Sequence, residues 1–157
     1  MKKLHFTLRP AMPEDRNFLY QLKKKVNLGY ISAIWGWDED YQQEEFDRDF
    51  QKREEFSVIV SDDADAGFLQ LQRGADFLNV AEIHLLPAFR GQGLGTAVLR
   101  YIQALGDKEE LPVLIGCFRA NQGARDLYLR LGFQPAGESD THYLFLYYPT
   151  KLPQEER

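Results

Sequence analysis

The N-terminal half of the chain shows the hydrophobic patterns of one strand, two helices and a strand pair. Leu4, Phe6 and Leu8 alternate with polar residues, which predicts a first strand that ends at Pro10. Apolar residues at helical spacing predict a helix that ends at about residue 27, followed by an irregular aromatic stretch over 28–37. Asp38 is suited to cap a second helix. The β-like runs 56–60 and 68–71 predict two strands joined by a polar turn.

The C-terminal half alternates more regularly between strands and helices. Residues 77–86 form the longest β-like run, and residues 94–105 form a helical stripe that we expect Gly106 to end. A short apolar run at 113–118 predicts a strand buried on both faces. After it come a helix capped by Asn121 and a final strand at 143–148. Alternation places five residues of the long run on one face: Leu78, Val80, Glu82, His84 and Leu86.

This order of elements predicts an α/β fold in one domain over residues 1–148, with a frayed tail at 149–157. The expected order is strand, helix, helix, three strands, helix, strand, helix and two strands. The helix at 94–105 joins two strands by a crossover, so the strands at 77–86 and 113–118 should be parallel.

Composition narrows the class of protein. The 157 residues carry a net charge of −5, which disfavours nucleic acid and anionic membranes as partners. The single cysteine, Cys117, excludes an internal disulfide, and the three histidines lack the spacing of metal ligands, so we expect no metal. No apolar run follows the N-terminus and none reaches membrane-spanning length, so we expect a cytoplasmic protein. We interpret Lys23–Lys25 as a solvated helix face.

Residues 90–96 read R-G-Q-G-L-G-T at the start of the helix at 94–105. Alternating glycines let the backbone approach a ligand closely, and a helix N-terminus offers unpaired N–H groups. This combination suits a phosphate or pyrophosphate. A Walker A loop is excluded because no Gly-Lys-Ser/Thr follows, and a dinucleotide fingerprint is weak because Thr96 occupies the place of its last glycine.

R-G-Q-G-L-G resembles the Q/R-x-x-G-x-G/A signature of the GNAT superfamily of N-acetyltransferases. A second segment, N-Q-G-A-R-D-L-Y-L-R-L-G-F at 121–133, resembles that family's N-x-x-A-x-x-L-Y-x-x-x-G-F. The resemblance covers residues 54–148 well and the first fifty more loosely. It implies a mostly antiparallel sheet of six to seven strands, splayed between the fourth and fifth strands and flanked by about four helices. It also implies transfer of an acetyl group from acetyl-CoA to an amine by direct attack.

The resemblance further implies which residues hold acetyl-CoA. Backbone amides of the glycine turn would hold its pyrophosphate beside Arg90, and the strand before the turn would pair with the pantetheine arm. Asn121 would contact the cofactor, although it is equally suited to a plain helix cap. The implied cofactor residues are Ile83, His84, Leu85, Arg90, Gly91, Gln92, Gly93, Leu94, Gly95, Thr96 and Asn121.

Three residues are candidates for proton transfer. Tyr128 corresponds to the family tyrosine that protonates the departing thiolate, and its alternative is a core aromatic. Glu82 lies where several GNAT enzymes carry a catalytic glutamate, but an ordinary carboxylate is a poor match to an amine. Its alternative is a half-buried carboxylate paired with Lys or Arg. His84 lies on the same strand face and is either a second base or a packed imidazole.

The acceptor side is less specific. Trp35, Trp37 and Asp38 could wall a pocket for a cationic small-molecule or peptide amine, or they could serve aromatic packing and a helix cap. Two other functions stay open. One is a non-catalytic acyl-CoA-binding or sensing module, and the other is an interaction domain in which residues 30–37 form a partner or homodimer surface.

Overall fold

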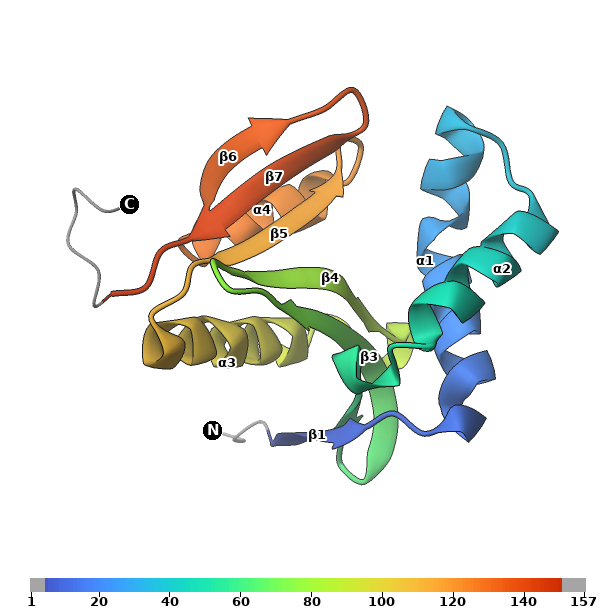
Figure 1. Cartoon of the computed structure of the whole chain (residues 1–157), viewed down its shortest axis with the longest axis horizontal. Helices are drawn as coiled ribbons and strands as arrows, with labels where there is room; N and C mark the ends of the chain where they lie inside the picture. The colour runs from blue at the N-terminus through green and yellow to red at the C-terminus, as the bar shows by residue number, and fades with distance from the viewer. Residues whose placement is uncertain (1–4, 151–157) are drawn as a thin grey trace. The chain divides into compact units, whose positions relative to one another are not determined.

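A computed structural model describes residues 5–150, which form two compact units. The first unit comprises the residues up to Gln70 together with Glu82–Gln92, and the second comprises Leu71–Ala81 together with the residues from Gly93 onward. The seven strands follow the order β1-β2-β3-β4-β5-β7-β6, which confirms the predicted mixed sheet and the predicted order of elements (Figure 1). The tail predicted for 149–157 lies mostly outside the described residues.

The first unit packs helices α1 (Arg16–Ile34) and α2 (Glu39–Phe50) with strands β1 (Phe6–Pro10) and β2 (Phe56–Ser61). It also contains most of strand β3 (Ala64–Arg73), up to Gln70. Strand β2 pairs antiparallel with both β1 and β3. Short 3-10 turns at Pro13–Asp15 and Arg53–Glu55 precede α1 and β2. The core of this unit is largely aromatic, because rings from α1, α2, β2 and β3 pack within 5.6 to 6.2 Å of one another: Tyr20, Phe46, Phe56 and Phe68.

Helix α1 is longer than the sequence predicts. The expected end near residue 27 and the irregular stretch after it are wrong, because helical hydrogen bonding continues to Trp35, whose N–H donates to Ile31 O at 2.8 Å. Gly36, with a left-handed φ of +81°, ends the helix. The periodic signal fades early because the last two turns face solvent, where Leu28 and Ile34 are 39% and 42% exposed.

The second unit contains α3 (Leu94–Glu109), β5 (Val113–Phe118), α4 (Gln122–Arg130), β6 (Gln134–Glu138) and β7 (His142–Tyr147). Strand β4 (Leu78–Leu85) begins in this unit, and it pairs parallel with β5 from Leu78–Val113 to Val80–Ile115, as predicted. From Val113 to Phe118, β5 pairs antiparallel with β7 on its other side. Helix α3 buries the predicted apolar stripe, including Leu94, Val98 and Ile102.

Gly106 does not end α3, contrary to the prediction, because the helix continues to Glu109. The left-handed residue that ends it is Glu110, with φ of +59°. Gly106 instead allows close packing. A Cβ at this position would lie 2.8 Å from both Leu111 O and Val113 Cγ2. A glycine near the end of an apolar stripe can therefore mark a crowded contact as well as a helix end.

Cys117 is a buried residue of β5 with 7% exposure. Burial raises the pKa of its thiol, and the nearby charge of Arg125 lowers it less. The residue therefore behaves as a small core side chain.

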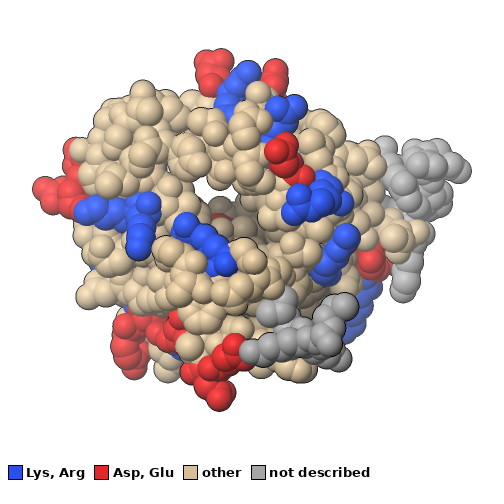
Figure 2. All heavy atoms as spheres, turned by 180° about the vertical axis from the view of Figure 1, so that it is seen from behind, with Lys and Arg blue, Asp and Glu red and all other residues tan. Residues whose placement is uncertain are grey.

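The surface gives two further observations. On the face shown in Figure 2, Lys and Arg side chains are interspersed with Asp and Glu side chains. No helix between residues 5 and 150 is long and apolar enough to cross a membrane.

Candidate active site

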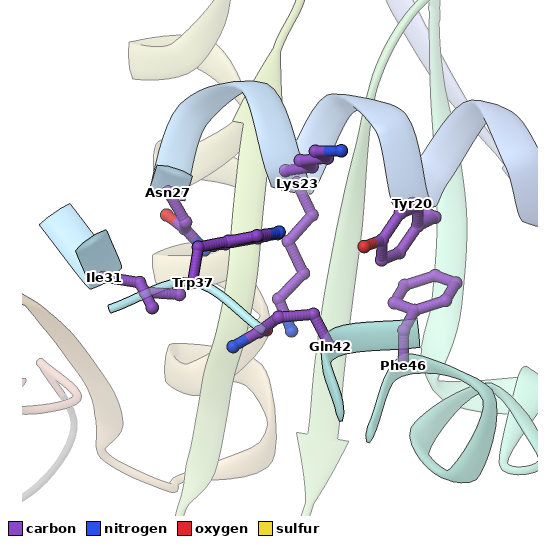
Figure 3. A pocket seen from close by; sticks show the side chains of 8 residues that line it. Tyr20, Lys23, Asn27, Ile31, Trp37, Gln42 and Phe46 are labelled. Carbon is purple, nitrogen blue, oxygen red and sulfur yellow. The ribbon is translucent and has the colours of Figure 1, made fainter. Parts of the chain in front are cut away.

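A small pocket lies between α1 and α2, within the first unit (Figure 3). Side chains from α1 and from α2 point toward each other there, with Trp37 beside them. The empty space between these side chains is about 230 Å³ when the part that is open to solvent is counted. Its walls combine aromatic, amide and basic groups: Tyr20, Lys23, Lys24, Asn27, Ile31, Trp37, Gln42 and Phe46.

Two of the lining residues, Tyr20 and Lys24, belong to an ionic and hydrogen-bonded cluster with Glu39. The Tyr20 hydroxyl and the Lys24 ammonium both donate to the carboxylate of Glu39, which is the first residue of α2. Burial raises the pKa of the Tyr20 hydroxyl, and the bond to Glu39 raises it further. The same contacts, Lys24 first and then Tyr20, lower the pKa of Glu39. Glu39 therefore serves to tie α2 to α1 with its negative charge already paired.

Trp37 is the one predicted acceptor residue that lines the pocket. Its ring lies 5.9 Å from the Lys24 ammonium. Its indole Nε1 is buried and has no hydrogen-bond partner among residues 5–150. Trp35 is 63% exposed at the end of α1, and the Asp38 carboxylate accepts from Tyr41 N at 3.0 Å as the cap of α2. The predicted cap at Asp38 is confirmed.

Glu82 and His84 share one face of β4, as the alternation predicts, and they contact each other directly. His84 Nε2 lies 2.5 Å from Glu82 Oε2, and Lys23 Nζ from α1 lies 3.1 Å from Glu82 Oε1. All three side chains are largely buried, with exposed fractions of 10% for His84, 19% for Glu82 and 22% for Lys23. Burial alone would raise the pKa of Glu82, but the bond to His84 and the charge of Lys23 outweigh it and lower the pKa to about 2.

The backbone of β4 passes very close to β3 at Ile83–Leu85, the residues predicted to pair with the pantetheine arm. Gly67 on β3 is buried, and a Cβ there would lie 2.1 Å from the carbonyl oxygen of His84. Just beyond, Leu86 N donates to Ala66 O at 2.8 Å. Only a glycine permits this approach, which fixes the backbone of Ile83–Leu85 against β3.

The glycine turn has a left-handed backbone at two of its three glycines. Gly91 and Gly93 have φ of +74° and +85°, and α3 begins at the next residue, Leu94. Gly93 is the N-cap and has no side chain with which to cap the helix. The first backbone N–H groups of a helix have no partner within the helix, so those of α3 can donate to a hydrogen-bond acceptor such as a phosphate oxygen. Arg90 Nε donates to Leu85 O at 3.0 Å, and Gln92 Nε2 donates to Ala88 O at 2.8 Å.

Helix α4 carries the second motif. Asn121 caps it, with its side-chain oxygen accepting from Ala124 N at 3.1 Å, as predicted. Tyr128 is 7% exposed, and its ring packs at 5.8 Å from Phe133 and 5.7 Å from Phe145. Its ring is therefore held by the core of the second unit.

Comparison with known proteins places this arrangement in a family. The model of the GNAT acetyltransferase family matches residues 17–133, more than half of the chain. The chain is a member of the GNAT acetyltransferase family. This GNAT protein therefore belongs to the acetyl-CoA-dependent acyltransferases. No curated protein sequence matches it.

Solved structures share the GNAT fold with this protein at low sequence identity. An acetyltransferase from Thermus thermophilus is 19% identical, with a TM-score of 0.72 over 94% of this chain and 99% of that chain. The PaiA N-acetyltransferase of Thermoplasma acidophilum, solved with coenzyme A, is 16% identical, with a TM-score of 0.70 over 92% and 99%. The ribosomal-protein-S18-alanine N-acetyltransferase of Escherichia coli is 17% identical, with a TM-score of 0.70 over 96% and 97%.

Sequence reasoning missed the role of Lys23 in this GNAT protein. The interpretation of Lys23–Lys25 as a solvated face is wrong for Lys23, which contacts Glu82, and for Lys24, which contacts Glu39. A signal was present for Lys23, because it lies four residues after Leu19 on the buried face of α1. Glu82, His84 and Trp37 lie in the first unit, whereas Asn121 and Tyr128 lie in the second.

Proposed function

We propose that this GNAT protein acetylates an amine by direct attack of the amine nitrogen on the thioester of acetyl-CoA, without a covalent acetyl-enzyme. The observation that carries this proposal is the pair of left-handed glycines, Gly91 and Gly93, immediately before α3. A turn of this kind at a helix N-terminus directs several amides toward an anion. The diphosphate of a CoA carrier is an anion of this kind, so the residues present fit the group.

The chain offers three sets of groups to the carrier. Backbone N–H groups of residues 91–96 donate to the diphosphate, and Arg90 adds a cation whose terminal guanidinium nitrogens lie beyond its Nε bond to Leu85 O. The backbone of Ile83–Leu85 pairs with the pantetheine arm. Asn121 adds a polar contact from the start of α4 while it caps that helix. Acetyl-CoA supplies the activated acetyl group, and these residues hold and orient it.

The reaction forms one bond and breaks another. The acceptor nitrogen bonds to the acetyl carbon, and the carbon–sulfur bond breaks, so the sulfur leaves as a thiolate. Tyr128 donates its phenol proton to that thiolate, because a phenol is protonated at neutral pH. A covalent relay through a thiol is disfavoured, since the single cysteine is buried in β5.

The acceptor amine enters beside the linker between α1 and α2. Trp37 supports this assignment because it lines the pocket, and because its buried indole N–H, which has no partner between residues 5 and 150, can donate to an oxygen of the acceptor molecule. Trp35 and Asp38 lie on either side of it in the sequence and complete the proposed acceptor region. The acceptor is a small-molecule or peptide amine.

Binding of the carrier can be tested by calorimetry with coenzyme A on Gly93→Ala. A non-glycine residue held at positive φ costs about 1–2 kcal/mol, so the free turn should relax away from the conformation that binds. Restoring it on binding should weaken affinity by roughly 5- to 30-fold. Gly36→Ala is the matched control, because Gly36 has φ of +81° and open space around it. Equal affinity for both variants would refute the assignment of the diphosphate.

Catalysis can be tested by incubating the protein with acetyl-CoA and a panel of primary amines and following the release of free thiol. Turnover with intersecting double-reciprocal lines supports direct attack, whereas parallel lines would indicate a covalent intermediate. Tyr128→Phe should lower turnover by roughly 10²–10⁴-fold, and Tyr101→Phe, at an exposed tyrosine of α3, should leave it unchanged. Tight binding of acetyl-CoA with no turnover on any amine would favour a sensing module instead.

A further inference from the structure

We propose that His84 takes the proton from the acceptor amine, and that Glu82 and Lys23 are positioning residues that hold its imidazole in the competent form. This inference rests on the proposed acetyl transfer and assigns the roles of residues within it.

The contacts of Glu82 leave little of its carboxylate for direct proton transfer. Oε1 lies 3.1 Å from Lys23 Nζ, and Oε2 lies 2.5 Å from His84 Nε2. Both oxygens are therefore engaged by groups of this chain. A carboxylate whose pKa is about 2 is also a far weaker base than the amine that it would have to deprotonate. Glu82 is better suited to orient a base than to be one.

The same contacts fix the tautomer of His84. An ionised carboxylate only accepts hydrogen bonds, so Nε2 of a neutral His84 must carry the proton that faces Glu82. The lone pair then lies on Nδ1, for which no hydrogen-bond partner is found in the described part of the chain. The ring also packs against Phe68 in a tilted arrangement, at 5.3 Å between ring centroids. A carboxylate that orients one nitrogen of an imidazole while the other takes a proton is an established catalytic arrangement.

Lys23 balances the charge of this arrangement. Its ammonium is the cation that contacts Glu82, and it lies 5.9 Å from the Phe46 ring. Asp49 of α2 also interacts electrostatically with Lys23 and Glu82, and two further carboxylates, Glu45 and Glu55, lie near Asp49. Burial raises the pKa of Asp49, Lys23 lowers it, and the three surrounding carboxylates raise it. Lys23 therefore offsets the negative charge of Glu82 and part of that of Asp49.

The proposed step conserves protons and electron pairs. An acceptor ammonium gives one proton to His84 Nδ1, which becomes an imidazolium beside the ionised Glu82. The freed nitrogen lone pair forms the bond to the acetyl carbon, and the carbon–sulfur electron pair leaves with sulfur. The second nitrogen proton restores the group that protonates the thiolate, and His84 releases its proton to solvent. The products are an amide, free CoA thiol and one proton.

The test is the pH dependence of kcat/KM for the wild type and three variants. An imidazole base gives an acidic limb between about pH 5 and 8, where kcat/KM falls as the base becomes protonated. His84→Asn should remove this limb and lower kcat/KM by roughly 10²–10⁴-fold. Glu82→Gln should move the midpoint to lower pH, because it removes the anion that stabilises the imidazolium. Lys23→Met should move it to higher pH, because it removes a repelling cation, and Lys23→Arg should restore it.

A matched control and a second measurement keep the test independent of folding. Lys25→Met changes an exposed lysine of the same helix and should move neither the midpoint nor the rate. Nitrogen NMR of the wild type, with the His84 signals assigned by their loss in His84→Asn, should show Nε2 protonated and Nδ1 bare at high pH. The opposite tautomer, or an acidic limb that survives in His84→Asn, would overturn the role of His84. Midpoints that shift alike in Glu82→Gln and Lys23→Met would overturn the positioning roles, whereas a wild type with no turnover on any amine would overturn the proposed function itself.

Discussion

The close approach of β3 and β4 at Gly67 allows a quantitative prediction for Gly67→Ala. The added Cβ would lie 2.1 Å from His84 O, 2.9 Å from Leu85 Cδ2 and 3.0 Å from His84 C. The contact with the carbonyl oxygen is roughly 1 Å shorter than real Cβ contacts allow, and the obstacle is backbone, so no rotamer change can relieve it. The two strands must therefore separate.

The cost has two parts. Overpacking a core commonly costs about 1–3 kcal/mol. Separating the strands by about 1 Å would also stretch the bond from Leu86 N to Ala66 O, now 2.8 Å, beyond hydrogen-bonding range. Leaving such a buried pair unmade costs about 1–3 kcal/mol. We therefore expect Gly67→Ala to lower the free energy of unfolding by about 2–5 kcal/mol, a large share of the roughly 5–15 kcal/mol typical of a domain.

Urea denaturation followed by circular dichroism measures this change. Gly29→Ala is the matched control, because Gly29 is an exposed residue of α1 with nothing within 4 Å of the Cβ that alanine would add. A helical Gly→Ala change there should stabilise the protein by about 0.5–1 kcal/mol. If Gly67→Ala unfolded within about 0.5 kcal/mol of the wild type, the close packing of β3 on β4 that holds Ile83–Leu85 would be refuted.

Three other changes probe separate elements. The pKa of Glu82 is about 2 in the folded protein, against an ordinary value of 4.5. Ionised Glu82 therefore stabilises the fold above about pH 4.5, and this stability is lost as the pH falls toward 2. Across this range the urea midpoint of the wild type should drop more than that of Glu82→Gln. Gly106→Ala should destabilise by about 1–3 kcal/mol in the same denaturation assay, because its Cβ would meet the backbone oxygen of Leu111 at 2.8 Å. Asn121→Ala removes the cap of α4 and should lower the thermal midpoint by the equivalent of about 1 kcal/mol, with a fall in turnover but no shift of the pH profile.

The sequence predicted the elements that depend on hydrophobic spacing and on capping residues nearby in the chain. The stripe of α3, the alternation of β4 and the caps at Asp38 and Asn121 all depend on neighbouring residues, and the structure confirms them. The parallel pairing of β4 with β5 followed from the handedness of crossovers.

What the sequence did not reveal depends on contacts between distant segments or on solvent exposure. The pairing of Lys23 with Glu82 joins α1 to β4, and no local pattern encodes it. Gly106 was predicted to end the helix because glycine often follows a helix. The packing of Leu111 and Val113 against it is a tertiary feature that local sequence does not show. The last turns of α1 were not predicted because apolar residues there, such as Leu28 and Ile34, are largely exposed and form no continuous apolar face.

The burial of Cys117 has a practical consequence for experiments on this protein. Cys117 carries the chain's only thiol, and burial raises the pKa of that thiol. A disulfide reagent such as Ellman's compound should therefore react with Cys117 slowly while the protein stays folded. Colour that develops during acetylation then reports liberated coenzyme, with little background from the enzyme. The slow residual labelling measures how often the strand that holds Cys117 opens, which gives a built-in probe of local unfolding without any engineered label.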